Sequence, residues 1–509
     1  MKQMHLKIED TRLSTLLNSI FIGILIGLIV STFRLAIEHL LEISQSIYRL
    51  ASSSWHWLAL IVVINIILAV LVGLLVKTSP QISGSGIPQI EGQLSGEYEE
   101  KWWPVLWKKF TGGILAIGSG LMLGREGPSI QLGAVVGQGW SETLHYSGSQ
   151  RRVLIAGGAA AGLSAAFNAP IASTLFVLEE IYHNFSPLVW ISALTSAVVS
   201  NFVSLNFFGL TPVLAIRYPH SLPLGLYWHL IALGILLGLF GRLYQLCTLN
   251  LKKWYQKISF LPRWLHSLVP FITIIPIGIL WPSYLGGGNS IITAIANKNP
   301  IFMTLFTLLI IRFIFSMVSY GSGLPGGIFL PILTLGAIFG ALYVSIMANL
   351  NLIDIHYLPN FVIYAMAGYF AAIGKAPFTA ILLITEMVGS LQHLMPLAVV
   401  ALTAYIVLDL LGGEPIYESL LHQLVPTITA TPSGPQDRVE IPIVEGSKLD
   451  GLAVRNISWP KESLLISIRR GSNSIIPSGD SVIKPGDTLI VTTHRENRKK
   501  IAAHFAKIN

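Results

Sequence analysis

Four short segments combine glycine and proline with residues that could bind an anion or carry a proton. The first, Gly84-Ser85-Gly86-Ile87-Pro88, places a hydroxyl between two glycines. Glycine relaxes the backbone, and proline fixes φ and removes an N–H, so this segment predicts a break between helices. At such a break Ser85 would present its O–H and neighbouring backbone N–H groups to a dehydrated anion. Taken alone, the motif is more typical of a flexible loop between helices without a ligand.

The second segment, Gly124-Arg125-Glu126-Gly127-Pro128, precedes an apolar stretch rich in glycine and alanine. Because proline is favoured in the first turn of a helix, we expect a helix to begin near Gly127 or Pro128. Its dipole and exposed N–H groups would then face Glu126, whose carboxylate could fill an anion site and leave it on protonation. The alternative is a charged loop at the membrane surface, which the apolar flanks 114–123 and 130–136 make less suitable.

The third and fourth segments lie in the second half of the chain. Gly326-Gly327-Ile328-Phe329-Leu330-Pro331 has no acid, and it could offer an anion only the backbone N–H groups of Ile328 and Phe329. Taken alone, it is typical of core packing. Gly412-Gly413-Glu414-Pro415-Ile416-Tyr417 ends an apolar helix and places Tyr417 just past a turn. A phenol can donate a hydrogen bond to an anion, although a tyrosine that anchors a helix end at the membrane surface is commoner.

Two adjacent acids, Glu179 and Glu180, follow the apolar run 175–178. Acids inside membrane helices are costly, and they are therefore default candidates for function. Polar residues and Pro187 come soon after, so the pair could equally mark a helix end at the membrane surface. The residues alone do not separate these two interpretations.

The chain contains an internal repeat. In the first repeat pair, residues 124–137 and 327–340 align a proline, a Leu-Gly-Ala step and a closing glycine. In the second repeat pair, residues 168–180 and 375–387 align an Ala-Pro step, a leucine and a glutamate. Transporters often consist of two such halves in inverted topology, with the binding site where broken helices from both halves meet. We therefore expect the glycine- and proline-rich segments to meet near the middle of the bilayer.

The composition indicates a protein that crosses the membrane many times. Of the 509 residues, 52% are apolar and 11% are charged, whereas about a quarter of all residues in soluble proteins are charged. Apolar stretches long enough to span a bilayer recur between residue 20 and about 411. We divide the chain into a polar lead (1–15), a membrane domain (16–423, with halves at about 16–215 and 220–423), a linker (424–436) and a small α+β domain (437–509).

Other functional classes fit the sequence poorly. The net charge of +8 agrees with the usual excess of Lys and Arg in cytoplasmic loops, and no basic face with stacking aromatics indicates nucleic-acid binding. No metal-ligand spacing or nucleophile–base set indicates an enzyme. A potassium-translocating subunit would need a TVGYG-type filter, which the sequence lacks.

Together, the motifs GSGIP, GREGPSIQLGA, GGIFLP and GGEPIY resemble, in order and approximate spacing, those of the CLC family of chloride channels and transporters. The resemblance covers roughly residues 16–423, and the combination is specific although each motif alone is weak. It implies an all-α polytopic membrane protein with an inverted-topology repeat of tilted and broken helices. It also implies a homodimer in membrane lipid, with one ion pathway in each subunit.

The resemblance also assigns roles to individual residues. Ser85 and Tyr417 match the side chains whose hydroxyls bind the central chloride, and Ile328 and Phe329 match the backbone N–H donors. Glu126 matches the gating glutamate, which competes with chloride for the pathway and accepts protons from the outer side. Serine at position 85 fits chloride over nitrate, and the intact motifs argue against the fluoride-exporting branch.

Glu180 matches the inner proton-transfer glutamate that distinguishes many exchangers of the family from its channels. The resemblance therefore implies secondary active exchange of chloride for protons, and a passive, voltage- or pH-gated chloride channel is the alternative. Chloride and protons would be the transported ions, and neither a cofactor nor a metal is expected.

The C-terminal domain shows apolar alternation at 441–444, 464–468 and 488–493, with a closing helix from about 495 to 506. It resembles the TrkA-C regulatory domain of potassium-conductance regulators, which implies either a small ligand or ion in a cleft or a cap that only stabilises a dimer. This domain favours a prokaryotic source. We expect an inner-membrane protein with its N-terminus and C-terminal domain in the cytoplasm.

Overall fold

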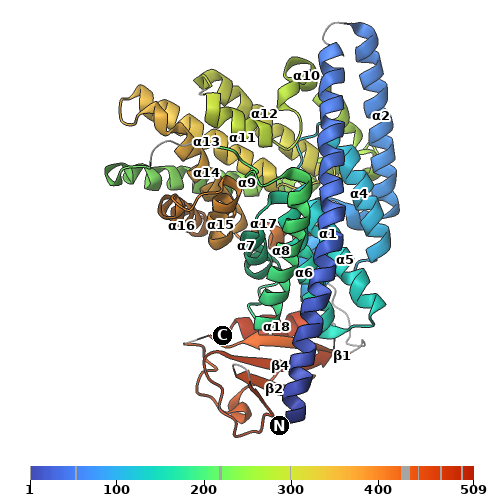
Figure 1. The fold of residues 1–509 in the computed structure, drawn as a ribbon, viewed down its shortest axis with the longest axis vertical. Coiled ribbons are helices and arrows are strands. Elements are labelled where there is room, and N and C mark those ends of the chain that lie inside the picture. The colour runs from blue at the N-terminus through green and yellow to red at the C-terminus, as the bar shows by residue number, and fades with distance from the viewer. Residues whose placement is uncertain are drawn as a thin grey trace.

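The computed structural model describes residues 2–508 apart from 52–53, 217–220, 299, 426–435, 445, 471–472 and 495–496, and the side chains of 2–11, 436–437 and 473 are also not described. Most of the expected linker, 424–436, lies outside the described residues. A helical body occupies the chain before this gap, and a small domain built around one β-sheet follows it (Figure 1).

The helices of the body are α1 (Lys2–Ala51), α2 (Trp55–Thr78), α3 (Ile87–Ser95), α4 (Trp102–Gly118), α5 (Glu126–Thr143), α6 (Gly148–Phe167), α7 (Pro170–Phe176), α8 (Pro187–Phe208), α9 (Trp228–Gln256), α10 (Leu268–Leu280), α11 (Asn289–Lys298), α12 (Phe302–Gly321), α13 (Phe329–Asn349), α14 (Leu358–Gly374), α15 (Pro377–Val388), α16 (Leu394–Leu410) and α17 (Ile416–Leu424). Short turns are η1 (Pro80–Ile82), η2 (Val177–Ile181), η3 (Leu224–Leu226), η4 (Arg263–Leu265), η5 (Pro282–Tyr284) and η6 (Ile355–Tyr357). The expected polar lead is thus the beginning of α1.

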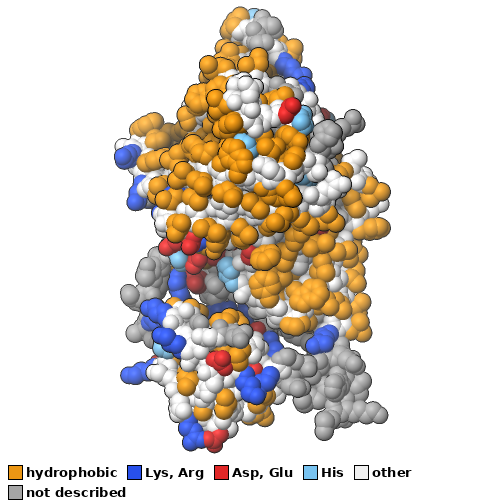
Figure 2. All heavy atoms as spheres, turned by 90° about the vertical axis from the view of Figure 1, so that its left-hand side faces the viewer, with side chains coloured by type: hydrophobic (Ala, Val, Ile, Leu, Met, Phe, Trp, Pro, Cys, Tyr) orange, Lys and Arg blue, Asp and Glu red, His pale blue; other side chains and the backbone are white. Residues whose placement is uncertain are grey.

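The body has the dimensions and surface of a membrane protein. Among the described residues, eight helices are long and apolar enough to cross a bilayer. Hydrophobic side chains cover the body on the face shown in Figure 2, whereas charged side chains gather on the small domain below it. In α13 and α14 the apolar windows are 83% and 89% buried inside the protein. These two helices therefore form the interior of the body and are shielded from lipid by the others.

Small residues let the central helices pack backbone against backbone. A Cβ on Gly133 of α5 would lie 2.1 Å from the carbonyl oxygen of Gly158 in α6. A Cβ on Gly340 of α13 would lie 2.3 Å from the carbonyl oxygen of Phe361 in α14. Lipid gives helices no hydrophobic reason to associate, so close packing of this kind holds membrane helices together. The pairs α5–α6 and α13–α14 occupy corresponding places in the two halves of the chain.

The C-terminal domain contains β1 (Gln436–Pro442), β2 (Ser463–Arg470), β3 (Asn473–Ile475), β4 (Asp487–His494), the turn η7 (Val454–Asn456) and α18 (Arg498–Ala506). The strands form an antiparallel sheet in the order β1-β4-β2-β3. The prediction for the first strand, 441–444, was wrong in position, because the pairing with β4 extends back to Gln436 and ends at Pro442. The first two residues of the expected closing helix lie outside the described residues, and α18 begins at Arg498.

One partly buried ion pair ties β2 to β4. Asp487 is buried, and its carboxylate accepts two hydrogen bonds of 2.7 Å from the guanidinium of Arg470. It also accepts one of 2.8 Å from the backbone N–H of Lys484. Burial favours the neutral acid, but these hydrogen bonds outweigh it and hold the pKa of Asp487 below its usual value. The carboxylate therefore stays charged and fixes the turn before β4.

α1 runs along the full height of the molecule, and its first residues lie at the same end as the C-terminal sheet (Figure 1). The beginning of the chain and the small domain are thus on one side of the helical body.

Candidate functional site

The segment around Ser85 is a break before a helix, as the sequence predicts. Gly84 and Gly86 have φ values of +67° and +91°, which glycine adopts without strain. α3 begins at Ile87, and its backbone N–H donates a 3.3 Å hydrogen bond to the Ser85 Oγ. Ser85 is 1% exposed, so the hydroxyl faces the interior of the protein.

Two other parts of the chain, the segment before α13 and the helix α4, fix this loop by hydrogen bonds. The Gly84 N–H donates to the carbonyl of Leu324 at 3.2 Å, and the Gly326 N–H donates to the carbonyl of Gly84 at 3.0 Å. The buried Lys109 of α4 donates to the carbonyls of Gly84 at 2.7 Å and Ile82 at 2.9 Å. Lys109 was missed in the sequence, where only its position on an otherwise apolar helix face gives a signal. Its side-chain nitrogen therefore ties the Ser85 loop to α4.

The first repeat pair meets directly. The Gly124 N–H donates to the carbonyl of Gly327, and the Gly327 N–H donates to the carbonyl of Gly124, both at 2.7 Å. α5 starts at Glu126 and α13 starts at Phe329, so two helix N-termini begin next to this bridge. Ile328 immediately precedes α13. The first N–H groups of each helix have no partner within the helix, and they give the region a partial positive charge.

Glu126 is itself the first residue of α5, one residue earlier than predicted, and it is fully buried. Its Oε2 would lie only 2.5 Å from a Cβ on Gly124, so glycine is needed there to admit the carboxylate. Neither carboxylate oxygen makes a hydrogen bond of good geometry with a described side chain, although Arg125 Nε is 4.0 Å away. The carboxylate instead interacts with the backbone N–H groups of Glu126 itself and of Leu330, and no described side chain fixes it in place.

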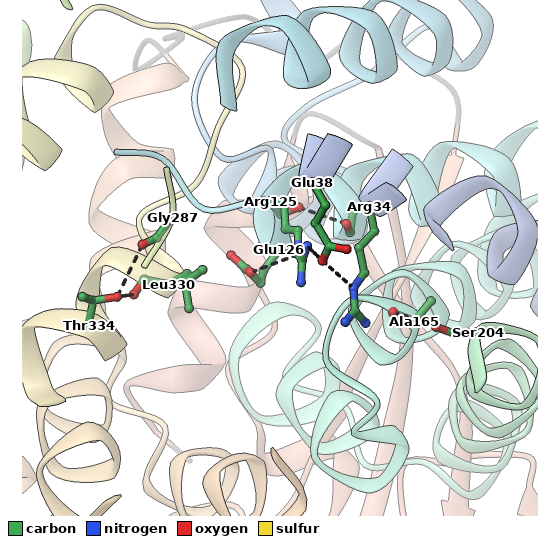
Figure 3. Close-up of polar contacts among 10 residues, drawn as sticks. Arg34, Glu38, Arg125, Glu126, Ala165, Ser204, Gly287, Leu330 and Thr334 are labelled. Atoms are coloured by element: carbon green, nitrogen blue, oxygen red, sulfur yellow. Dashed lines mark hydrogen bonds and ion pairs between the residues drawn. The ribbon is translucent and has the colours of Figure 1, made fainter. Parts of the chain in front are cut away.

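A charge cluster lies beside Glu126 (Figure 3). Glu38 of α1 accepts hydrogen bonds from Arg125 at 2.6 Å and from Arg34 at 3.2 Å. The cluster of two arginines and one glutamate has a formal charge of +1, which an ionised Glu126 or an anion would balance. Arg34 and Glu38 were missed, because nothing in the sequence brings α1 to the start of α5.

Tyr417 follows the turn at Leu411 and Gly412 and lies in the first turn of α17, which begins at Ile416. The residue is fully buried, and its hydroxyl has no hydrogen-bond partner among the described residues. Its ring packs edge-on against Phe176 with centroids 6.1 Å apart. A buried phenol without a protein partner is a donor available to a bound anion.

Aromatic rings gather around the start of α13. Phe329 lies 4.4 Å from Phe370, 5.3 Å from Phe167 and 5.6 Å from Phe176, measured between ring centroids. Phe176 belongs to α7 and contacts Tyr417 on its other side. This aromatic cluster (Phe167, Phe176, Phe329 and Phe370) forms an apolar wall next to the backbone donors of α13.

In the second repeat pair, a glutamate from each half of the chain caps the N-terminus of a helix in the other half. Glu179 accepts hydrogen bonds from the N–H of Thr379 at 2.9 Å and from its hydroxyl at 2.7 Å, at the start of α15. Glu386, the aligned acid of the other half, accepts from the N–H of Ala172 at 2.8 Å, at the start of α7. Both carboxylates sit at helix N-termini, where the dipole favours negative charge. Glu179 therefore has a structural role.

Glu180 has no such partner. It is 4% exposed, and its Oε1 makes no hydrogen bond to any described residue. It lies on η2, a π-helical turn that directly continues α7. Such turns are rare and occur frequently at functional sites. The structure thus separates two acids that the sequence presents as equivalent.

A cavity of about 520 Å³ opens onto the Ser85 loop. Its lining includes Ser85 and Tyr320, and it carries the basic side chains of Lys77, Lys252 and Arg263. A charged lining of one sign concentrates ions of the opposite sign. Tyr320 was missed, because it ends α12 in a stretch where sequence alone suggests an anchor.

The family model described as voltage gated chloride channel matches residues 67–409, and the TrkA-C domain model matches residues 438–506. The H(+)/Cl(-) exchange transporter ClcA of Vibrio campbellii is 35% identical over 422 residues, which cover 81% of this chain and 90% of that protein. The ClcA of Vibrio cholerae is 36% identical over 427 residues, covering 82% and 90%.

Solved structures give the same result. A slow cyanobacterial Cl-/H+ antiporter matches with a TM-score of 0.76 and 31% identity, covering 81% of this chain and 98% of that chain. A eukaryotic CLC transporter matches with a TM-score of 0.68 and 25% identity, covering 80% and 74%.

Proposed function

Because this chain belongs to the CLC family of voltage-gated chloride channels and transporters, we propose that it exchanges chloride for protons across the membrane, with the anion bound at the Ser85 loop. It is a multi-pass membrane transporter with a C-terminal TrkA-C domain, not an enzyme. The observation that carries the proposal is the placement of two buried, weakly held acids, Glu126 and Glu180, around a set of uncharged anion donors.

The anion site would use four donors. The hydroxyls of Ser85 and Tyr417 are buried, and the first N–H groups of α13, at Ile328 and Phe329, have no helical partner. Such donors replace the water shell of chloride without giving a full positive charge. The ion is then bound loosely enough to leave.

The proton route would use both acids. Glu126 at the N-terminus of α5 is attracted to the same positive region as chloride, so its carboxylate and the anion compete for one place. Protonation removes the charge and releases the side chain. Glu180 would receive the proton on the other side of the aromatic cluster, through transient water. Competition at Glu126 links the two fluxes, since chloride enters more readily when the acid is protonated.

The test is a vesicle experiment with purified protein. An outward chloride gradient, with the membrane potential clamped, should drive protons into the vesicles against their own gradient. The reversal potential should also shift when only the pH gradient is changed. A reversal potential set by chloride alone would indicate the alternative, a passive channel. No chloride-dependent flux at any pH would contradict the proposal itself.

Replacement of Ser85 by proline should change anion selectivity. Proline has no hydroxyl, so chloride loses one donor, and a hydrogen bond to a charged group contributes about 1.5–3 kcal/mol. We expect the chloride-to-nitrate flux ratio to fall about ten-fold. Ser83→Ala is the matched control, because the Ser83 hydroxyl lines the same cavity but donates to the carbonyl of Gly323. An unaltered ratio in Ser85→Pro would remove Ser85 from the site.

We further propose a homodimer with one ion pathway per subunit, as is common in the family, in the inner membrane of a prokaryote. The start of α1 and the C-terminal domain lie at one end of the molecule, which supports a position for both on the same side of the membrane (Figure 1); we place this side in the cytoplasm. Chloride and protons are the transported ions, and no cofactor takes part. A small ligand of the C-terminal domain belongs to the same proposal.

A further inference from the structure

The C-terminal domain contacts the helical body at the end of α3. The guanidinium of Arg498, the first residue of α18, donates to the carbonyl of Leu94 at 3.3 Å. The next residue, Lys499, forms an ion pair of 3.1 Å with Glu97. On the body's side, Gly96 ends α3 with φ +83°, and a Cβ there would lie 3.1 Å from the Cδ of Arg498. The glycine thus makes room for the arginine.

Arg498 occupies a place where a cation is favourable. The last carbonyls of a helix have no partner within it and carry partial negative charge, and arginine or lysine near them is stabilising. In α3 the carbonyl of Leu94 belongs to this last turn. Lys499 and Glu97 are a more exposed pair, and such pairs contribute little. Of the two contacts at the end of α3, Arg498 is therefore the more specific one.

α3 leads directly from this junction to the anion site. Its nine residues begin at Ile87, immediately after the Ser85 loop. The side chain of Gln89 donates to the carbonyl of Ser83 at 2.8 Å, which ties the helix to the loop a second time. A helix of this length moves as one rigid body, so a displacement of its end at Leu94 also displaces its start.

The same helix touches the other parts of the pathway. Gln93 donates to Gln138 of α5 at 2.6 Å. α3 also packs against α17, where a Cβ on Gly92 would lie 2.7 Å from the Cδ1 of Leu421, and against η2. α5, α17 and η2 are the elements that carry Glu126, Tyr417 and Glu180. α3 is thus one element through which the C-terminal domain reaches the site; a second contact runs to α6, where Arg152 donates to the carbonyl of Arg438 in β1 at 3.4 Å.

We propose that Arg498 is a positioning residue of the transporter: by capping α3 it holds the Ser85 loop in the geometry that binds chloride, and it makes the C-terminal domain a regulator of that site. Movement of α18 away from α3 weakens chloride binding and slows exchange. The inference rests on the proposed function, since the affected site is the chloride site.

The experiment compares full-length variants in detergent and in vesicles. Chloride affinity is measured by isothermal titration calorimetry, and chloride and proton fluxes are measured in parallel. Arg498→Ala should raise the Kd for chloride about three- to ten-fold and slow exchange, and Arg498→Lys should recover most of the loss. Lys500→Ala is the matched control, because it removes a positive charge from the exposed side of the same helix. It should behave as wild type.

A second variant changes the residue of the helical body that contacts Arg498. Gly96→Asn keeps a residue that tolerates positive φ but adds a Cβ 3.1 Å from the Cδ of Arg498, which must shift by a few tenths of an ångström. It should therefore raise the Kd in the same direction as Arg498→Ala, but by less. The double variant should be no worse than the more affected single variant, because both remove one contact. If Arg498→Ala fails to fold by size-exclusion chromatography, Gly96→Asn and Arg498→Lys decide the question.

An unchanged Kd and an unchanged exchange rate in folded Arg498→Ala or Gly96→Asn would overturn the inference. Equal losses in Lys500→Ala would also overturn it, since they would indicate a general effect of charge. Failure of the proposed function gives a different result. In that case wild type itself shows no chloride-driven proton flux, whereas failure of this inference leaves wild-type exchange intact.

Discussion

Replacement of Glu126 by glutamine is expected to abolish proton coupling while chloride still crosses the membrane. The variant keeps the size of the side chain but carries neither a charge nor an acidic proton. It cannot compete with chloride as an anion at the start of α5, and it cannot pass on a proton. In vesicles, an imposed chloride gradient should therefore move protons no faster than in protein-free vesicles. Chloride efflux should continue under a potential clamp.

The control for this change lies on the same helix. Glu142, near the far end of α5, pairs with Arg151 at 3.0 Å and is half-exposed. Glu142→Gln also removes one negative charge from α5, and it should keep both the coupling and the rate. Proton pumping that survives in Glu126→Gln would contradict the assignment of Glu126. Loss of coupling in Glu142→Gln would show that the overall charge of the helix matters instead.

The positive neighbours of Glu126 explain why a carboxylate is tolerated in a buried place. Arg34, Arg125 and Glu38 together leave one positive charge unbalanced, and the N-terminus of α5 adds the dipole. A buried charge without compensation would cost several kcal/mol. Chloride at the same place would be stabilised by the same groups. This shared stabilisation is the physical basis of the competition.

The sequence predicts the breaks in this fold well, because glycine and proline act on the local backbone. The break at Gly84 to Pro88 lies where expected, the helix at Glu126 starts one residue earlier than predicted, and α13 starts at Phe329, inside the third glycine- and proline-rich segment. The internal repeat also indicated which segments would meet, and the bridge between Gly124 and Gly327 is that meeting. Both inferences use only short-range geometry and the repetition of a pattern.

The sequence alone does not indicate which distant segments come into contact. Lys109 reaches the Ser85 loop across 25 residues, and Arg498 reaches α3 across 404 residues. Both side chains look like ordinary surface cations until the tertiary fold is known. The first strand of the C-terminal domain was misplaced for the same reason, since its limits are set by pairing with β4 and not by its own apolar residues.

The two adjacent glutamates give the sharpest test of the proton route. Glu180→Gln should block proton transport and leave chloride flux within about two-fold of wild type, because Glu180 contacts no anion donor directly. Glu179→Gln should keep the coupling, because Glu179 caps α15 through Thr379. Glu179→Gln should instead lower the free energy of unfolding by about 0.5–2 kcal/mol, because a charged helix cap is lost. This loss is measured as a lower thermal midpoint.

Opposite outcomes at neighbouring positions exclude a general effect of charge, since both variants remove one negative charge from the same turn. Flux stoichiometry from simultaneous chloride and pH electrodes distinguishes the two, and thermal unfolding in detergent measures the cap. Coupling lost in Glu179→Gln but kept in Glu180→Gln would reverse the assignment. In that case the acid that holds α15 would also carry the proton, and α15 would have to move during each cycle.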